Sequence, residues 1–125
     1  MKKYLSLLVL SLSALICTVP AYAAGSQVQV AIKDFGFSPA TVTVSAGTTV
    51  TWTNYDDDPH TVADRGSPQA FRSSALDTQG KFSYTFTTPG SYAYFCTLHP
   101  HMVGKVIVTG AGIGSGAGSG TAHGG

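Results

Sequence analysis

The sequence predicts an all-β fold, a Greek-key antiparallel β-sandwich or barrel. Apolar β-branched and aromatic residues alternate with polar residues in several short runs, and this period of two is typical of half-buried strands. Turn-forming residues separate the runs at intervals of about 8 to 12 residues, which is the spacing found in sandwiches and barrels. The sequence contains no convincing apolar stripe with the period of a helix.

Five alternating runs are expected to form strands. In the first run, Val28, Val30 and Ile32 alternate with polar residues. The other four runs lie at residues 41–44, 49–53, 82–87 and 106–108. Turn signals lie between the runs, at Ser38-Pro39, Ala46-Gly47, Asp58-Pro59, Gly66-Ser67-Pro68, Gln79-Gly80 and Pro89-Gly90. Residues 66–76 fit the pattern least, and we expect an irregular crossover there, in which one helical turn would fit.

The first residues have the pattern of an export signal. Lys2 and Lys3 precede an apolar run at residues 5–19, and Ala21-Tyr22-Ala23 gives the small-x-small pattern that signal peptidase cleaves. The apolar run has about 15 residues, which is short of the roughly 18 to 20 that span a bilayer. We therefore expect a cleaved signal peptide at residues 1–23 and a periplasmic or secreted mature protein.

The mature chain is expected to contain one folded domain at residues 24–109, because about 100 residues suffice for one modest core. Residues 110–125 consist mainly of Gly, Ala and Ser. Ordering them would cost backbone entropy without burying apolar surface, so we expect a flexible tail. His123 lies in this tail and is not expected to have a functional role.

The charge distribution excludes some partners. Removal of Lys2 and Lys3 with the signal peptide changes the formal net charge from +1 to −1, so nothing directs the protein to nucleic acid or to an anionic membrane. The only acidic run is Asp56-Asp57-Asp58, and the sequence contains no glutamate. We interpret this run as a solvated loop before a functional residue, because the spacing and closing Glu of an EF-hand calcium site are missing.

Cysteine usage points to a metal site. Once Cys17 is removed with the signal peptide, Cys96 is the only cysteine, so it is either buried and inert or bound to something that protects it. His99 and Met102 follow it at C-x2-H-x2-M spacing, in a short loop after the expected end of a strand at Cys96. His60 comes directly after Pro59, which restricts the approach of the chain. Two imidazoles and a thiolate with an axial thioether form the ligand set of blue copper sites.

Two alternatives bear on this site. Zinc is the rival metal, but a thioether is a poor zinc ligand and structural zinc sites usually carry more thiolates, so we favour copper. His101 neighbours Met102 and is a competing ligand, but we expect its side chain to point outward.

With these residues the sequence resembles the cupredoxins, a family of small blue copper proteins, and in particular the plastocyanin and amicyanin group. The similarity covers residues 27–109. It is carried by residues 35–39 (FGFSP), residues 47–54 (GTTVTWTN), Pro59-His60, and the loop with Cys96, His99 and Met102. The loop has the short amicyanin-like length, whereas plastocyanins place two more residues between the last two ligands.

The resemblance implies a cupredoxin-like fold and one copper ion. It assigns His60 as a ligand through one ring nitrogen, Cys96 as the thiolate, His99 as the partly exposed ligand and Met102 as the axial ligand. It also implies that Tyr92 forms a tyrosine corner that ties a crossover to the sandwich.

One departure from the family pattern affects the support of the metal site. Many members have Asn directly after the first His ligand, where this chain has Thr61. We expect Thr61 to form a hydrogen bond with Thr97 in a similar bracing role.

These features predict a soluble, exported, monomeric type 1 copper protein that carries single electrons and is not an enzyme. Its partners would be redox proteins such as a dehydrogenase, a cytochrome or an oxidase, in transient contact with the exposed edge of His99 beside Leu98 and Pro100. An oxidase or nitrite reductase would need further histidines for additional copper centres. A copper storage or delivery module without electron transfer is the alternative, although delivery proteins favour open, exchangeable sites. We expect neither nucleic acid binding nor stable membrane insertion.

Overall fold

The structure is a computed structural model, and it describes residues 25–110. The predicted signal peptide at residues 1–23 lies outside the described residues. The same holds for residues 111–125, which form all but the first residue of the predicted tail. Residues 25–110 contain no helix, and therefore none long and apolar enough to cross a membrane.

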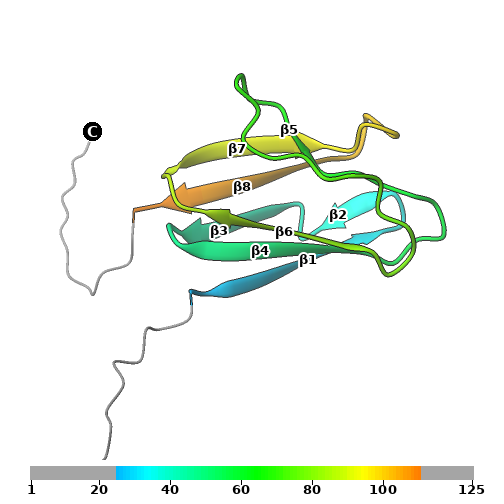
Figure 1. Cartoon of the computed structure of the whole chain (residues 1–125), viewed down its shortest axis with the longest axis horizontal. Coiled ribbons are helices and arrows are strands. Elements are labelled where there is room, and N and C mark those ends of the chain that lie inside the picture. The colour runs from blue at the N-terminus through cyan, green and yellow to red at the C-terminus, as the bar shows by residue number, and fades with distance from the viewer. Residues whose placement is uncertain (1–24, 111–125) are drawn as a thin grey trace, which may run out of the picture.

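The described chain forms a β-sandwich of two four-stranded sheets (Figure 1). The first sheet has the order β2-β1-β4-β6 and contains β1 (Gln27–Lys33), β2 (Gly36–Ser38), β4 (Thr48–Asn54) and β6 (Lys81–Phe86). The second sheet has the order β3-β8-β7-β5 and contains β3 (Thr41–Ser45), β5 (Ala63–Asp64), β7 (Gly90–Phe95) and β8 (Val103–Thr109). The predicted all-β sandwich is confirmed.

Both sheets are mixed, whereas an antiparallel sandwich was expected. β1 pairs with β4 in parallel, with Val30 opposite Trp52, and β3 pairs with β8 in parallel, with Val44 opposite Val108. In each case the chain leaves the sheet and crosses to the other one before it returns, which allows parallel neighbours. Alternation along a strand reports only which face is buried, so it cannot distinguish the two pairings.

The five predicted strands are present, and β7 ends at Phe95, one residue before the expected end. The short strands β2 and β5 were not predicted. The helical turn suggested for residues 66–76 is wrong, because this segment pairs with the chain around His60 instead. The Leu76 amide donates to the His60 carbonyl at 2.7 Å, and the Ser73 amide donates to the Val62 carbonyl at 2.8 Å.

The core is built on aromatic side chains from both sheets and from the crossover. Trp52, Tyr94 and Phe86 are the largest fully buried side chains. Phe71 of the crossover packs against them, with ring centroids 5.9 Å from Trp52 and 5.4 Å from Phe86. Each large apolar side chain buried in this way contributes roughly 1.5 to 3 kcal/mol to stability. Close packing of these rings makes the sandwich a stiff support for the loops at its end.

Tyr92 ties the turn before β7 to that strand. Its hydroxyl donates a hydrogen bond to the carbonyl oxygen of Thr88 at 2.6 Å, which confirms the tyrosine-corner contact implied by the family resemblance. The bond spans four residues along the chain and fixes the start of the strand that leads to Cys96.

Tyr94 is buried without a hydrogen bond from its hydroxyl to the described part of the chain. It faces Gly104 across the β7–β8 pair, where an added Cβ atom would clash with the tyrosine ring. Glycine at this position therefore makes room for the ring. Burial raises the pKa of Tyr94 from its ordinary value of 10.0 to about 12.

Tyr94→Phe is expected to leave the metal-free protein at least as stable at neutral pH, because the buried hydroxyl forms no hydrogen bond within residues 25–110. Between the ordinary pKa of 10.0 and the folded value of about 12, the unfolded chain releases the phenol proton and the folded chain retains it. The free energy of unfolding of the wild type therefore falls as pH rises through this range. In the variant it should fall less steeply with pH. Urea unfolding at neutral and alkaline pH measures both effects. A variant less stable at neutral pH by more than about 1 kcal/mol would contradict the assignment of an unpaired hydroxyl.

Candidate metal centre

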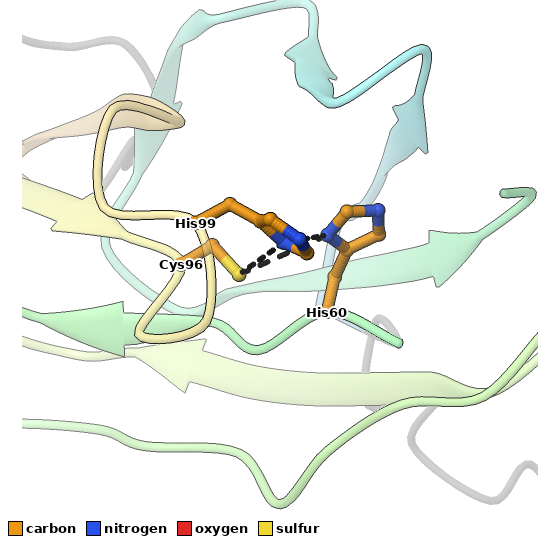
Figure 2. A group of neighbouring side chains, drawn as sticks. All are labelled: His60, Cys96 and His99. Atoms are coloured by element: carbon orange, nitrogen blue, oxygen red, sulfur yellow. Dashed lines mark hydrogen bonds between the residues drawn. The ribbon is translucent and has the colours of Figure 1, made fainter. Parts of the chain in front are cut away.

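The predicted ligands come from two loops at one end of the sandwich. Cys96 directly follows β7, and His99 and Met102 lie in the loop between β7 and β8. His60 lies in the segment between β4 and β5, where it forms an isolated bridge with Leu76. Figure 2 shows the side chains of His60, Cys96 and His99 pointing toward one another.

The donor atoms of these three side chains form a compact triangle. Sγ of Cys96 lies 3.8 Å from Nδ1 of His60 and 3.8 Å from Nδ1 of His99, and the two Nδ1 atoms are 3.2 Å apart. A point equidistant from the three atoms lies about 2.1 Å from each of them, close to the roughly 2.0 to 2.3 Å of metal bonds to imidazole nitrogen and thiolate sulfur. The triangle therefore has the size required to hold one transition-metal ion.

Met102 is buried beside this triangle, with 2% of its surface exposed. Its amide donates to the His99 carbonyl at 2.8 Å, and its carbonyl accepts from the Cys96 amide at 3.1 Å. These two bonds fold the loop back on itself. The C-x2-H-x2-M spacing thus places a thiolate, an imidazole and a thioether on one closed loop.

The chemistry of this donor set fits copper. Soft sulfur ligands suit Cu(I), imidazole suits Cu(II), and a trigonal His₂Cys arrangement with a Met nearby is typical of blue copper sites. Structural zinc sites are tetrahedral and rarely include a thioether.

The surroundings of Cys96 favour its thiolate form. Burial alone raises the pKa of the thiol, but the Thr61 amide, which donates to Sγ at 3.3 Å, and the two imidazoles lower it by more. The resulting pKa is about 6, against an ordinary value of 9.0. A thiolate is the form of cysteine that binds metals, so the protein environment prepares this ligand.

Thr61 joins the two loops that carry the ligands. The amide of Thr97 donates to Oγ1 of Thr61 at 2.7 Å, and the two hydroxyl groups are 2.8 Å apart. This confirms the predicted hydrogen bond between Thr61 and Thr97. Threonine can therefore brace the metal site at the position where many family members have Asn.

Asp56 supports the site in a way that was not predicted. Its side chain is 12% exposed, and its Oδ2 lies 2.9 Å from Nε2 of His60. A carboxylate can only accept, so Nε2 carries a hydrogen and Nδ1 is the ring nitrogen that faces Cys96. The interpretation of residues 56–58 as a solvated loop is therefore wrong for Asp56, whereas Asp57 and Asp58 are exposed. A carboxylate four residues before a candidate ligand was the available signal, because metal-binding histidines commonly donate to one.

Asn54 and Phe35 also belong to the surroundings of the site. Buried Asn54 accepts from the Asp56 amide at 2.9 Å and donates to the carbonyls of Asp58 and Leu76, both at 2.8 Å. It thereby shapes the loop before His60. Phe35 packs its ring against both imidazoles, and its role could not be inferred from the sequence alone.

The histidines differ in exposure. His60 is fully buried, whereas His99 is partly exposed and is flanked by exposed Leu98 and Pro100. His101 is exposed, as predicted, and it does not belong to the metal-binding group of His60, Cys96 and His99.

Comparison with known proteins shows which protein family the chain belongs to. The model of the cupredoxin-like domain family matches residues 6–108. Amicyanin from Paracoccus versutus is 42% identical over 84 residues, which cover 65% of this chain and 64% of that protein. Chloroplastic plastocyanin from Tetradesmus obliquus is 43% identical over 83 residues, which cover 58% of this chain and 57% of that protein. The solved structure of an amicyanin variant in its Cu(I) form has a TM-score of 0.64 and 33% identity, and the match covers 71% of this chain and 88% of that chain.

The chain belongs to the cupredoxin family, as the residues of the metal site and the two-sheet sandwich indicated. Within that family it is similar to amicyanins and plastocyanins. It spans less than two thirds of the length of the two relatives named above.

Thr61→Val should destabilise the metal-free protein by about 1 to 3 kcal/mol, because the Thr97 amide loses its acceptor in a place with little access to water. Thr61→Ser retains the hydroxyl and is the matched control, which should lose much less stability. Urea unfolding of both variants measures the difference. Equal stability of the valine and serine variants would show that the hydroxyl does not brace the two loops.

Proposed function

We propose that the protein is a type 1 copper protein that carries single electrons between redox partners and is not an enzyme. The observation that supports this proposal most is the triangle of two Nδ1 atoms and one Sγ atom, which already has the dimensions of a metal site. In this proposal the side chains of His60, Cys96, His99 and Met102 would hold one copper ion.

Copper, when bound, supplies a one-electron couple between Cu(I) and Cu(II). The protein contributes a fixed geometry that changes little between the two oxidation states. The bonds of the Met102 amide and carbonyl close one loop, and Thr61 connects that loop to the His60 segment. Small rearrangement favours fast electron transfer, and a stiff aromatic core resists larger movement.

Partners are proposed to dock where His99 reaches the surface. Leu98 is 49% exposed and Pro100 is also exposed, so the edge of His99 lies within a small apolar area. Redox partners such as a dehydrogenase, a cytochrome or an oxidase form weak, small interfaces that suit repeated exchange. Such contacts do not require a stable complex, and we propose that the carrier is a monomer.

The buried position of the site favours a carrier over a storage or delivery module. His60, Cys96 and Met102 are nearly inaccessible to solvent, which is expected to slow release of the metal. Additional copper centres of an enzyme would need further histidine ligands, and in residues 25–110 only His101 remains outside the proposed set.

We further propose that residues 1–23 direct export and are removed, that residues 24–109 form the functional domain, and that residues 110–125 are a flexible tail. Export to the periplasm or beyond would place the carrier with partners outside the cytoplasm.

Cys96→Ser is expected to abolish the intense visible absorption that a copper–thiolate bond gives the wild type, because the sulfur is lost. His101→Ala is the matched control and should retain the full absorption, since His101 is exposed and outside the metal-binding group. Absorption spectra and copper content of the purified proteins measure the effect. An unchanged spectrum in the serine variant would refute the assignment of Cys96.

The proposed export signal predicts a mature protein that begins at Ala24. Mass spectrometry of the protein from a periplasmic fraction should give the mass of residues 24–125. Ala23→Lys should block cleavage, because the peptidase requires a small residue there. Recovery of the wild type with its first 23 residues intact would contradict the proposal.

A further inference from the structure

The carboxylate of Asp56 accepts three hydrogen bonds from two separate parts of the chain. Oδ1 accepts from the amide of Asp34 at 2.8 Å, and Oδ2 accepts from the amide of Phe35 at 2.9 Å. Oδ2 also lies 2.9 Å from Nε2 of His60. A single side chain thus connects the turn between β1 and β2 to a predicted metal ligand.

A carboxylate is the only side-chain group of this size that can satisfy all three donors. It offers two acceptor oxygens and no donor, whereas an amide of the same shape replaces one oxygen by an NH₂ group. His60 is fully buried and the Asp56 side chain is only 12% exposed, so water has limited access to replace the acceptor of Nε2. Burial alone raises the pKa of Asp56, but the hydrogen bonds from Phe35, Asp34 and His60 lower it by more.

The turn that Asp56 holds has an unfavourable backbone. Asp34 has φ 51° and Phe35 has φ 56°, and together they form the two-residue link between paired Lys33 and Gly36. Two positive φ values are required by a type I′ hairpin turn, for which Asn and Gly are preferred. A bulky residue such as Phe is rare in this region. The two hydrogen bonds to Asp56 help to offset this strain.

The same turn places an aromatic ring over the site. The Phe35 ring packs edge-on against both imidazoles, with centroids 5.3 Å from His60 and 5.1 Å from His99. Phe35 is also 43% exposed. Its ring therefore extends from the protein surface to both nitrogen ligands.

We propose that Asp56 is a positioning residue that fixes the positions of both the His60 and the Phe35 side chains. Its carboxylate holds Nε2–H of His60, so that Nδ1 faces Sγ of Cys96, and it caps the strained turn that places Phe35 against both imidazoles. This inference rests on the proposed copper site for its effect on the metal, while its effect on the metal-free protein stands apart from that proposal.

The expected direction of the effect on copper follows from the hydrogen bond. An imidazole whose N–H is hydrogen-bonded to a carboxylate donates its other nitrogen's electron pair to a metal more strongly. Loss of such a carboxylate typically costs about ten- to a hundredfold in metal affinity. Cu(II) depends on imidazole more than Cu(I) does, so the affinity for Cu(II) should fall further and the reduction potential should rise. Each tenfold change in the ratio of the two affinities corresponds to about 59 mV for a one-electron couple.

The test compares Asp56→Asn with Asp57→Asn, which removes the same charge one residue away from an exposed side chain. In the metal-free proteins, nitrogen NMR of the histidine rings reports the tautomer of His60 and the exchange of its Nε2 proton. Asp56→Asn should speed the exchange of the Nε2 proton and change the chemical shift of the Phe35 amide. Asp57→Asn should leave the exchange rate and the chemical shift as in the wild type. In the copper-loaded proteins, the reduction potential of Asp56→Asn should be higher than that of the wild type and that of Asp57→Asn.

Asp34→Gly in the Asp56→Asn background separates turn strain from ligand positioning. Glycine adopts positive φ without steric cost, so stability should be partly restored while the potential and the His60 proton exchange stay altered. Identical behaviour of Asp56→Asn and Asp57→Asn in every measurement would overturn the inference. Restoration of the wild-type potential by Asp34→Gly would also overturn it, because Asp56 would then act only through the turn. Failure of the wild type to bind copper would instead refute the proposed function, and the NMR comparison would still decide the role of Asp56.

Discussion

The end of the sandwich depends on one constraint, which is that a thiolate and two imidazole nitrogens from two loops are held within 3.8 Å of one another. Burying three polar groups away from water costs free energy unless the surrounding chain satisfies their remaining hydrogen bonds. The Thr61 amide donates to the thiolate, and Asp56 accepts from the far side of His60. The geometry of the donor triangle therefore depends on its hydrogen-bonded surroundings as much as on the ligands themselves.

These surroundings are fixed in turn by the sandwich. The His60 segment pairs with the crossover through Leu76, and the crossover is anchored in the core by Phe71. β7 carries Cys96 from a turn that Tyr92 ties down. Each ligand loop is thus connected to the packed aromatic core within a few residues. This arrangement suits a site whose geometry should change little when one electron is gained or lost.

The sequence was sufficient for most of the strands and for the candidate ligands, but not for the short strands β2 and β5 or for the parallel pairings. Period-two alternation marks strands locally, and the C-x2-H-x2-M spacing lies within one short loop, so neither requires knowledge of distant contacts. His60 lies 36 residues before Cys96 and was predicted from its place after Pro59 and from the family resemblance. The Thr61–Thr97 bond was predicted from the family resemblance, because Thr61 stands where many members have an Asn that braces the ligand loop. The role of Asp56 was missed because two of its donors lie 21 and 22 residues away and meet it only after the β1–β2 hairpin forms. That hairpin turn was missed because Asp-Phe is not a usual pair for it.

The protein scaffold itself sets the positions of the three donor atoms. X-ray absorption at the copper edge tests it most directly, because it measures the distances from the metal to nitrogen and sulfur in both oxidation states. We expect two nitrogen neighbours and one short sulfur neighbour at about 2.1 Å, consistent with the donor triangle, and little change on reduction. A site dominated by oxygen ligands, or one that loses a histidine or the thiolate on reduction, would contradict it.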